Sequence, residues 1–207
     1  MMMRTMGPAL LALGLLGLSA CGESDPMNMP EDDAGPVIEP ACSPPEPPYG
    51  VQLGNNVRPF TLNDCNNVEW EMYGEQEGFC DASFTLIIMA AGWCVPCQRE
   101  AEEIGRGVLD SYKDQGVRVI TAMIQSEDRR APTEADCDGW VNEYNLLGET
   151  VLYDPQQEIV NNFAETSLPG NAIVDSRGRL VHEEHGFSTA LGTIRGTLDD
   201  LLADLEE

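Results

Sequence analysis

The stretch that decides the fold is "IIMAAGWCVPCQREAEEI", residues 87–104, in which only two residues separate Cys94 from Cys97. An apolar run of strand length, "FTLIIMA" at 84–90, leads into the pair, and a helical pattern follows it. A continuous apolar run is typical of a strand that is covered on both faces. The pair is therefore predicted to begin a helix immediately after a buried central strand.

A helix start favours a thiolate, because free backbone N–H groups and the helix dipole stabilise negative charge there. Cysteines in such positions have pKa values lowered from about 8.5 into a range of roughly 3.5 to 7.5. We expect Cys94 to be the exposed nucleophile and Cys97, one turn inward, to be its buried resolving partner. Pro96 suits the first turn, where its missing N–H would have had no helical acceptor.

Three interpretations of the cysteine pair compete. A structural disulfide is disfavoured because so small a loop constrains the unfolded chain little, and its tight geometry tends to make it reducible. A zinc site would need two further ligands, and the sequence holds no second CxxC and no HxxxH. His182 and His185 cannot be assumed to share a face, and the alternative is two surface histidines, so we predict no metal site. The third interpretation, a redox pair, is the one we adopt.

Beyond the motif, strand and helix patterns alternate along the chain. This alternation, ending in a hairpin, predicts an α/β sandwich with a mixed central β-sheet flanked by helices and an N-terminal β-hairpin extension. The expected strands are 60–62, 68–70, 84–90, 117–124, 151–153, 171–175 and 179–183. The expected helices are 94–113, weakened by Gly105 and Gly107, then 134–144, 156–164 and 188–205.

The start of the chain has the features of an exported lipoprotein. Residues 1–20 hold one positive charge and an apolar run shorter than the roughly 20 residues that a bilayer core needs, which indicates a signal peptide. "LSAC", ending at Cys21, resembles a bacterial lipobox, so Cys21 is predicted to carry lipid; an incidental cysteine at an ordinary cleavage site is the alternative. Acyl chains would hold the protein at a bacterial membrane. The absence of aspartate after Cys21 favours, by analogy, the outer membrane facing the periplasm.

Composition separates a tether from a globular domain. Residues 21–48 are acidic, Pro-rich and almost without aromatics, and are predicted to be a semi-extended tether. Residues 49–207 suit one globular domain. The chain has 36 acidic and 11 basic residues and a net charge of -25, which disfavours nucleic acid and anionic lipid headgroups as partners.

The motif and its flanks resemble a known family. "GWCVPC" followed by a helix resembles the thioredoxin superfamily, and the details resemble its extracytoplasmic, membrane-tethered branch, the TlpA/ResA-like thiol–disulfide oxidoreductases, which are close to the AhpC/TSA family. "VRPFTLNDCNN" at 57–67 resembles their opening hairpin, and "SLPGNAIVDSRGRLVHEEHG" at 167–186 resembles the segment that holds their cis-proline. The resemblance covers nearly the whole domain and implies a thioredoxin-like fold.

The resemblance also implies which residues meet the substrate. Pro169 falls at the cis-proline, whose role is to bring the backbone of Leu168 beside the cysteines, where it pairs with an incoming peptide or thiol. A trans loop proline is the alternative, since only about 5–6% of X–Pro bonds are cis. Trp93 and Pro96, within the motif, are expected to contact the substrate as well.

One acidic residue and two departures from the pattern complete the comparison. Glu100 matches a glutamate of the ResA-like branch that assists proton transfer at Cys97; the alternative is a solvent-facing helix residue. Ile88 stands where cytoplasmic thioredoxins have a buried aspartate. Gly170 replaces the usual threonine after the cis-proline, which leaves the substrate contacts there open.

The remaining cysteines suggest structural disulfides. Of seven cysteines, four remain when the predicted lipid and redox positions are set aside, and an even remainder in an oxidising compartment suggests two bonds with three possible connectivities. The resemblance favours Cys65–Cys80, since these segments lie near each other in the related fold, and leaves Cys42 with Cys137. The alternative is that some of the four are free or reactive.

The function expected from the sequence is that of a lipid-anchored, extracytoplasmic thiol–disulfide oxidoreductase. Its substrates would be protein thiols and disulfides, with an extracytoplasmic redox partner and no cofactor beyond the Cys94–Cys97 pair. Two alternatives stay open. One is a non-catalytic binding module with the same fold, and the other is a copper-handling protein that uses the two thiolates.

Overall fold

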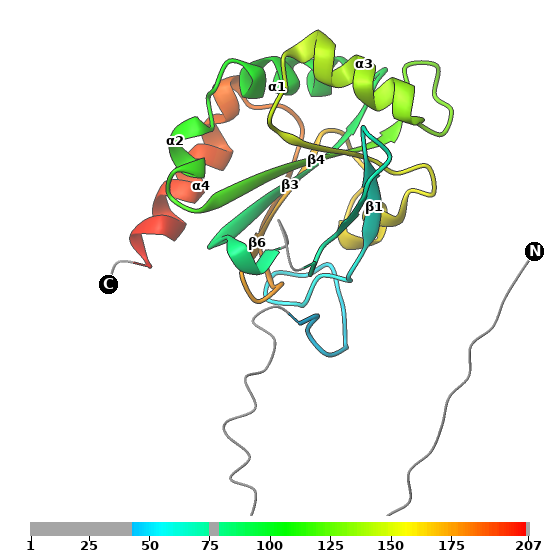
Figure 1. The fold of residues 1–207 in the computed structure, drawn as a ribbon. Helices are drawn as coiled ribbons and strands as arrows, with labels where there is room; N and C mark the ends of the chain where they lie inside the picture. Colours follow the sequence, from blue (N-terminus) through cyan, green and yellow to red (C-terminus); the bar gives the residue numbers. More distant parts are fainter. Residues whose placement is uncertain (1–42, 75–78, 206–207) are drawn as a thin grey trace, which may run out of the picture. The chain divides into compact units, whose positions relative to one another are not determined.

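The structure is a computed structural model that describes residues 43–74 and 79–205 (Figure 1). The expected signal peptide at 1–20, most of the tether at 21–48, and the cysteines Cys21 and Cys42 lie outside the described residues. None of the helices in these two ranges is long and apolar enough to cross a membrane.

A seven-stranded mixed sheet forms the centre of the part of the chain that the structure describes, in the order β2-β1-β5-β4-β3-β6-β7. The inner strands β3, β4 and β5 run parallel to one another. The hairpins β1–β2 and β6–β7 lie at the two edges, and both join the inner strands antiparallel. The strands are β1 Thr61–Asp64, β2 Glu69–Glu71, β3 Phe84–Ala91, β4 Val117–Gln125, β5 Thr150–Tyr153, β6 Gly170–Asp175 and β7 Leu180–His185. The predicted α/β class, mixed sheet and N-terminal hairpin are confirmed.

The central strand β3 is buried along its whole length. All eight of its residues are buried, as are seven of the nine residues of β4 beside it. Each large apolar side chain placed there, such as Leu86 or Ile120, contributes about 1.5 to 3 kcal/mol relative to an exposed position. The strand that leads into the cysteine pair is therefore the most firmly held element of the sheet.

The α-helices lie along one side of the sheet (Figure 1). The crossovers from β3 to β4 and from β4 to β5 step in the same direction, so right-handed connections put both of their helices on the same side. The side-chain amide of Asn145, which follows the helix between β4 and β5, donates to the Gly105 carbonyl at 3.4 Å. The hydroxyl of Tyr112 donates to the Asp199 carboxylate at 2.7 Å. The helices are α1 Val95–Gly105, α2 Asp110–Lys113, α3 Glu134–Tyr144 and α4 Gly192–Ala203.

Three predicted helices differ from the structure, and local backbone geometry explains two of them. The predicted helix 94–113 is interrupted between α1 and α2, where Gly107 has a φ of 80°. The predicted helix 188–205 becomes α4 only after the short 3-10 helix η3, Thr189–Leu191, because Ala190 and Leu191 have left-handed backbones. The predicted helix 156–164 is the 3-10 helix η2, Glu158–Asn162. A third 3-10 helix, η1, spans Phe79–Asp81.

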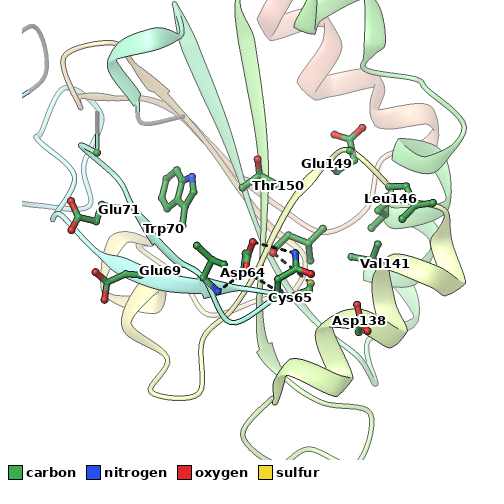
Figure 2. A pocket seen from close by; sticks show the side chains of 16 residues that line it. Asp64, Cys65, Glu69, Trp70, Glu71, Asp138, Val141, Leu146, Glu149 and Thr150 are labelled. Atoms are coloured by element: carbon green, nitrogen blue, oxygen red, sulfur yellow. Dashed lines mark hydrogen bonds between the residues drawn. The ribbon is translucent and has the colours of Figure 1, made fainter. Parts of the chain in front are cut away.

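The predicted Cys65–Cys80 disulfide is wrong, because the structure joins Cys65 to Cys137. Strand β1 pairs with β5, and β5 follows α3, so the hairpin turn with Cys65 is brought against the helix that carries Cys137. Figure 2 shows Cys65 in that turn, beside Asp138 and Val141 of α3. The predicted partner of Cys137, Cys42, is thereby excluded as well, and Cys80 is disulfide-bonded but not to Cys65.

Candidate active site

Cys94 is the N-cap residue of α1, immediately after the central strand. Its sulfur accepts a hydrogen bond from the backbone N–H of Cys97 at 3.2 Å, and the two cysteines form a disulfide. A Cβ at Gly92 would lie 2.6 Å from the backbone nitrogen of Glu127, so glycine lets the loop after β4 approach the motif closely. The helix start that the sequence predicts is confirmed, and it directs free backbone N–H groups at the Cys94 sulfur.

The two cysteines differ less in exposure than expected. Cys94 is 3% exposed and Cys97 is 2% exposed, so Cys94 is not the exposed residue that we predicted. The asymmetry lies in what each one faces. Cys94 lines a cavity of about 790 Å³ together with Trp93 and Pro96, whereas Cys97 is not among the lining residues.

The segment before β6 also lines this cavity. Thr166, Ser167 and Leu168 line it, and the Leu168–Pro169 peptide bond is cis, as the resemblance implied. The carbonyl of Pro169 accepts a hydrogen bond from the Gly186 N–H at 2.8 Å. The structure thus brings Trp93, Cys94, Pro96 and Leu168 together around one cavity.

His185, on β7, contacts this segment through a hydrogen bond. Its Nδ1 lies 2.9 Å from the carbonyl oxygen of Ser167, and its Nε2 lies 2.9 Å from the Glu183 carboxylate. Both partners are hydrogen-bond acceptors, so the ring bridges the Ser167 carbonyl and the Glu183 carboxylate. A Cβ at Gly170 would lie 2.9 Å from Met89 and 3.4 Å from the His185 ring. The tight contacts of such a Cβ would be with Met89 and with Phe163, which would lie 3.3 Å away, whereas the distance to the histidine is an ordinary contact.

The other histidine of the "HEEH" segment makes a separate contact. His182 Nε2 lies 3.4 Å from the Glu184 carboxylate. His182 and His185 are an odd number of residues apart on β7, so their side chains point to opposite faces of the sheet. Within the two described ranges, no group of three His, Cys, Asp or Glu residues is arranged to hold a metal ion.

Glu100 is buried beneath the motif rather than facing solvent. Its side chain belongs to the buried face of α1, the residue is 1% exposed, and neither carboxylate oxygen has a hydrogen-bond partner among the described residues. Burial raises the pKa of Glu100 to about 8, the nearby Asn171 amide opposes that rise, and the Glu184 charge adds to it. The Asn171 amide also lacks a partner of good geometry in the described chain.

A cation and an amide frame Trp93 at the cavity. The indole N–H of Trp93 donates to the Gln125 side chain at 2.8 Å, and the Arg129 guanidinium lies 3.7 Å from the centre of its rings. Neither Gln125 nor Arg129 was identified from the sequence, since the residues after a buried strand carry no local signal of where they point. The same holds for Asn171, although its position two residues after Pro169 could have marked it.

A second cavity, of about 700 Å³, lies between the β1–β2 hairpin, β5 and α3 (Figure 2). Neither Cys94 nor Cys97 is among its lining residues, and the Cys65 side of the structural disulfide borders it. Carboxylates dominate its polar lining, namely Asp64, Glu69, Glu71, Asp138 and Glu149. The Cys65 sulfur in this lining belongs to the Cys65–Cys137 disulfide and not to the CxxC motif, so the candidate site is the cavity at Cys94.

Comparison with known proteins identifies the family. The model of the AhpC/TSA family matches residues 53–183, which is more than half of the 207-residue chain. The chain belongs to the AhpC/TSA family. The match includes both motif cysteines, Glu100 and Pro169, and ends before His185.

Curated relatives show which members of the AhpC/TSA family this chain resembles. Thiol-disulfide oxidoreductase ResA of Bacillus thuringiensis and that of Bacillus anthracis are each 28% identical over 97 residues, which is 47% of this chain and 51% of the relative. The chain thus spans about half the length of the curated relatives it matches. The TlpA/ResA-like resemblance read from the motif is confirmed.

Solved structures share the fold of the family member. A hypothetical protein from Sinorhizobium meliloti aligns with a TM-score of 0.64 at 18% identity, over 75% of this chain and 87% of that chain. The thioredoxin domain of a thiol-disulfide oxidoreductase from Bacteroides vulgatus aligns with a TM-score of 0.56 at 13% identity, over 72% of this chain and 99% of that chain. These likenesses show a thioredoxin-like fold.

Proposed function

We propose that this protein is a thiol–disulfide oxidoreductase whose working group is the Cys94–Cys97 pair. The observation that carries the proposal is the position of Cys94, which caps α1 and lines a cavity that Leu168 also lines. An incoming disulfide in that cavity can meet the Cys94 sulfur, while the backbone of Leu168 offers an extended peptide a pairing edge. The ResA relatives support the same chemistry.

In the reductive direction, the reaction has two exchange steps. The Cys94 thiolate attacks one sulfur of a substrate disulfide, an S–S bond forms between enzyme and substrate, and the other substrate sulfur leaves as a thiolate that takes up a proton. Cys97 then loses its proton and attacks the Cys94 sulfur, which releases the second substrate thiolate and forms the Cys94–Cys97 disulfide. Two electrons pass from the enzyme to the substrate, and a dithiol redox partner returns them.

Glu100 is proposed to accept the proton of Cys97 in the second step. Its buried position on α1, three residues after Cys97, and the rise of its pKa to about 8 support a role as an internal base at neutral to alkaline pH. A carboxyl with a pKa near the working pH can take the proton and later release it. Asn171, from β6, is close enough to favour the ionised form.

The proposed setting follows from the start of the chain. Residues 1–20 would direct export, Cys21 would carry the lipid, and the acidic segment 21–48 would hold the domain away from a bacterial membrane, with the outer membrane facing the periplasm preferred. Substrates would be extracytoplasmic protein thiols and disulfides. The redox group is the cysteine pair itself, with no added cofactor.

The test is insulin reduction driven by dithiothreitol, together with metal analysis of the purified protein. Active wild type free of bound copper supports the proposal. Inactive protein with copper bound would support the copper-handling alternative. Inactive protein without metal would support the binding-module alternative. Cys97→Ser should accumulate mixed disulfides on non-reducing gels, because it attacks but cannot resolve, and Cys94→Ser should trap far less. Equal trapping by the two variants would contradict the assignment of roles.

A further inference from the structure

Arg129 is the charged residue of the cavity at Cys94. The other side chains that line this cavity are apolar or neutral, apart from the Cys94 sulfur. The residue itself is exposed, on the loop that follows β4. A permanent positive charge therefore stands on the wall of a cavity that holds the proposed nucleophile.

The guanidinium of Arg129 is held in place but not neutralised. It lies over Trp93, 3.7 Å from the ring centre, and Trp93 is fixed by its hydrogen bond to Gln125. Within the described part of the chain, the Arg129 side chain has no ion pair and no hydrogen bond, so its N–H donors remain open. Stacking uses the face of the guanidinium and leaves the donors at its edge for a ligand.

Two charged neighbours of Arg129, Asp128 and Arg130, are paired with other groups. Arg130 pairs with Asp136 at 2.8 Å and with Asp128 at 3.1 Å. The Asp128 carboxylate also accepts a hydrogen bond from the Ser126 hydroxyl at 2.6 Å. The turn that makes these contacts gives Arg129 a left-handed backbone, with a φ of 64°, and turns its side chain away from them towards Trp93.

The positive charge of Arg129 is opposite in sign to the net charge of the protein. The chain holds 36 acidic and 11 basic residues, so its average surface repels anions. At physiological ionic strength, exposed charges more than about 8 Å apart are largely screened. The charge that a bound substrate meets beside Cys94 is therefore set by Arg129 rather than by the net charge of the protein.

We propose that Arg129 is a substrate-binding residue that selects disulfides carrying a carboxylate next to the reacting sulfur. The inference rests on the proposed oxidoreductase function and specifies its substrate class. The planar guanidinium matches a carboxylate through two parallel hydrogen bonds. A peptide with an acidic residue beside its cysteine and a small anionic disulfide share this chemistry. Peptides are the substrates to which the Leu168 edge adds a second contact.

The first test compares two alkylating agents on the reduced protein. Iodoacetate is anionic and iodoacetamide is neutral, and both react with the same Cys94 thiolate, so the ratio of their rates cancels any change in thiolate population. We expect Arg129→Gln to lower the iodoacetate-to-iodoacetamide ratio about 3- to 10-fold, in line with an ion pair at a partly exposed site. Arg129→Lys should keep most of the ratio. Arg177→Gln, an equal change of charge at an exposed residue outside the cavity, should leave the ratio unchanged.

The second test measures kcat/KM for disulfide pairs in which one member is anionic and the other is neutral. The pairs are a disulfide-linked peptide with Glu or Gln beside the cysteine, and dithiodiglycolate against hydroxyethyl disulfide. Wild type should prefer the acidic member about 3- to 10-fold, and Arg129→Gln should lose that preference. Preference within the peptide pair but not the small pair assigns the site to peptides, and the reverse assigns it to small disulfides.

Two results overturn the inference and separate it from the proposed function. Reduction of acidic and neutral substrates at equal kcat/KM by wild type, or an alkylation ratio that Arg129→Gln does not change, removes the selection by charge and leaves the oxidoreductase intact. Failure of wild type to reduce any of the four disulfides overturns both.

Discussion

Glu100 should make the protein less stable as the pH rises from about 5 to 8. The residue is 1% exposed, and burial raises its pKa from 4.5 to about 8. The folded chain therefore holds this proton more tightly than the unfolded chain does, and the stability that the neutral carboxyl contributes is lost as the pH rises towards the folded value. At about 1.4 kcal/mol per pH unit, the rise from pH 5 to pH 8 allows a loss of at most about 4 kcal/mol. We expect about 2 to 3 kcal/mol, because water entry and local rearrangement relieve part of the cost.

The assay is urea denaturation of the oxidised protein at pH 5, 6, 7 and 8, for wild type and Glu100→Gln. Glutamine keeps the shape but has no charge to bury, so the free energy of unfolding of the variant should gain on that of wild type as the pH rises. Glu102→Gln is the matched control, because the Glu102 side chain is 51% exposed on the same helix. Parallel pH profiles for wild type and Glu100→Gln would show that the carboxyl is ionised at little cost and would refute the buried-acid argument.

Three further results are expected. Radioactive palmitate should label wild type and not Cys21→Ala. Equal labelling of both would contradict the predicted lipidation of Cys21. Mass spectrometry of the non-reduced tryptic digest should detect the Cys65–Cys137 linkage. This disulfide joins cysteines 72 residues apart and stabilises the fold by about 4 kcal/mol in the chain-entropy account. Alkylation of either cysteine in the native protein would contradict the linkage. His185→Gln should raise KM for insulin about 3- to 10-fold with little change in kcat, because the Ser167 carbonyl loses a partner. An unchanged KM would show that the segment holds its position without His185.

The sequence predicted those elements whose signals are local. The runs at 84–90 and 117–124 are apolar throughout, and a strand buried on both faces is their simplest solution. The helix predicted at 134–144 matches α3 because a capping box at Thr133 starts it and Asn145, in a left-handed conformation, ends it. Where a helix break depends on left-handed residues that are not glycine, as at Ala190 and Leu191, the composition did not indicate it.

Features that depend on long-range pairing could not be predicted in the same way. The pairing of β1 with β5 decides the partner of Cys65, and β2, β3 and β4 lie between these two strands in the sequence. The motif located Cys94 and Cys97, but its spacing alone did not indicate that both would be almost fully buried. Nor could helical periodicity distinguish Glu100 from its solvent-facing neighbours, since "EAEE" places acids on several faces of the helix.

The departure from the family pattern at Gly170 has a physical explanation in its neighbours. A Cβ there would lie 2.9 Å from Met89 and 3.3 Å from Phe163, with the ring of His185 in ordinary contact at 3.4 Å. That ring reaches the Ser167 carbonyl and is itself braced by Glu183, which also accepts the Ala164 N–H at 2.8 Å. The support for this part of the cavity lining thus comes from β7, across the hairpin, instead of from a side chain following the cis-proline. Because His185 pairs with Gly170 across the β6–β7 hairpin and contacts the Ser167 carbonyl, the "HEEH" segment, uninformative as a metal pattern, acquires a role in holding the segment that lines the cavity at Cys94.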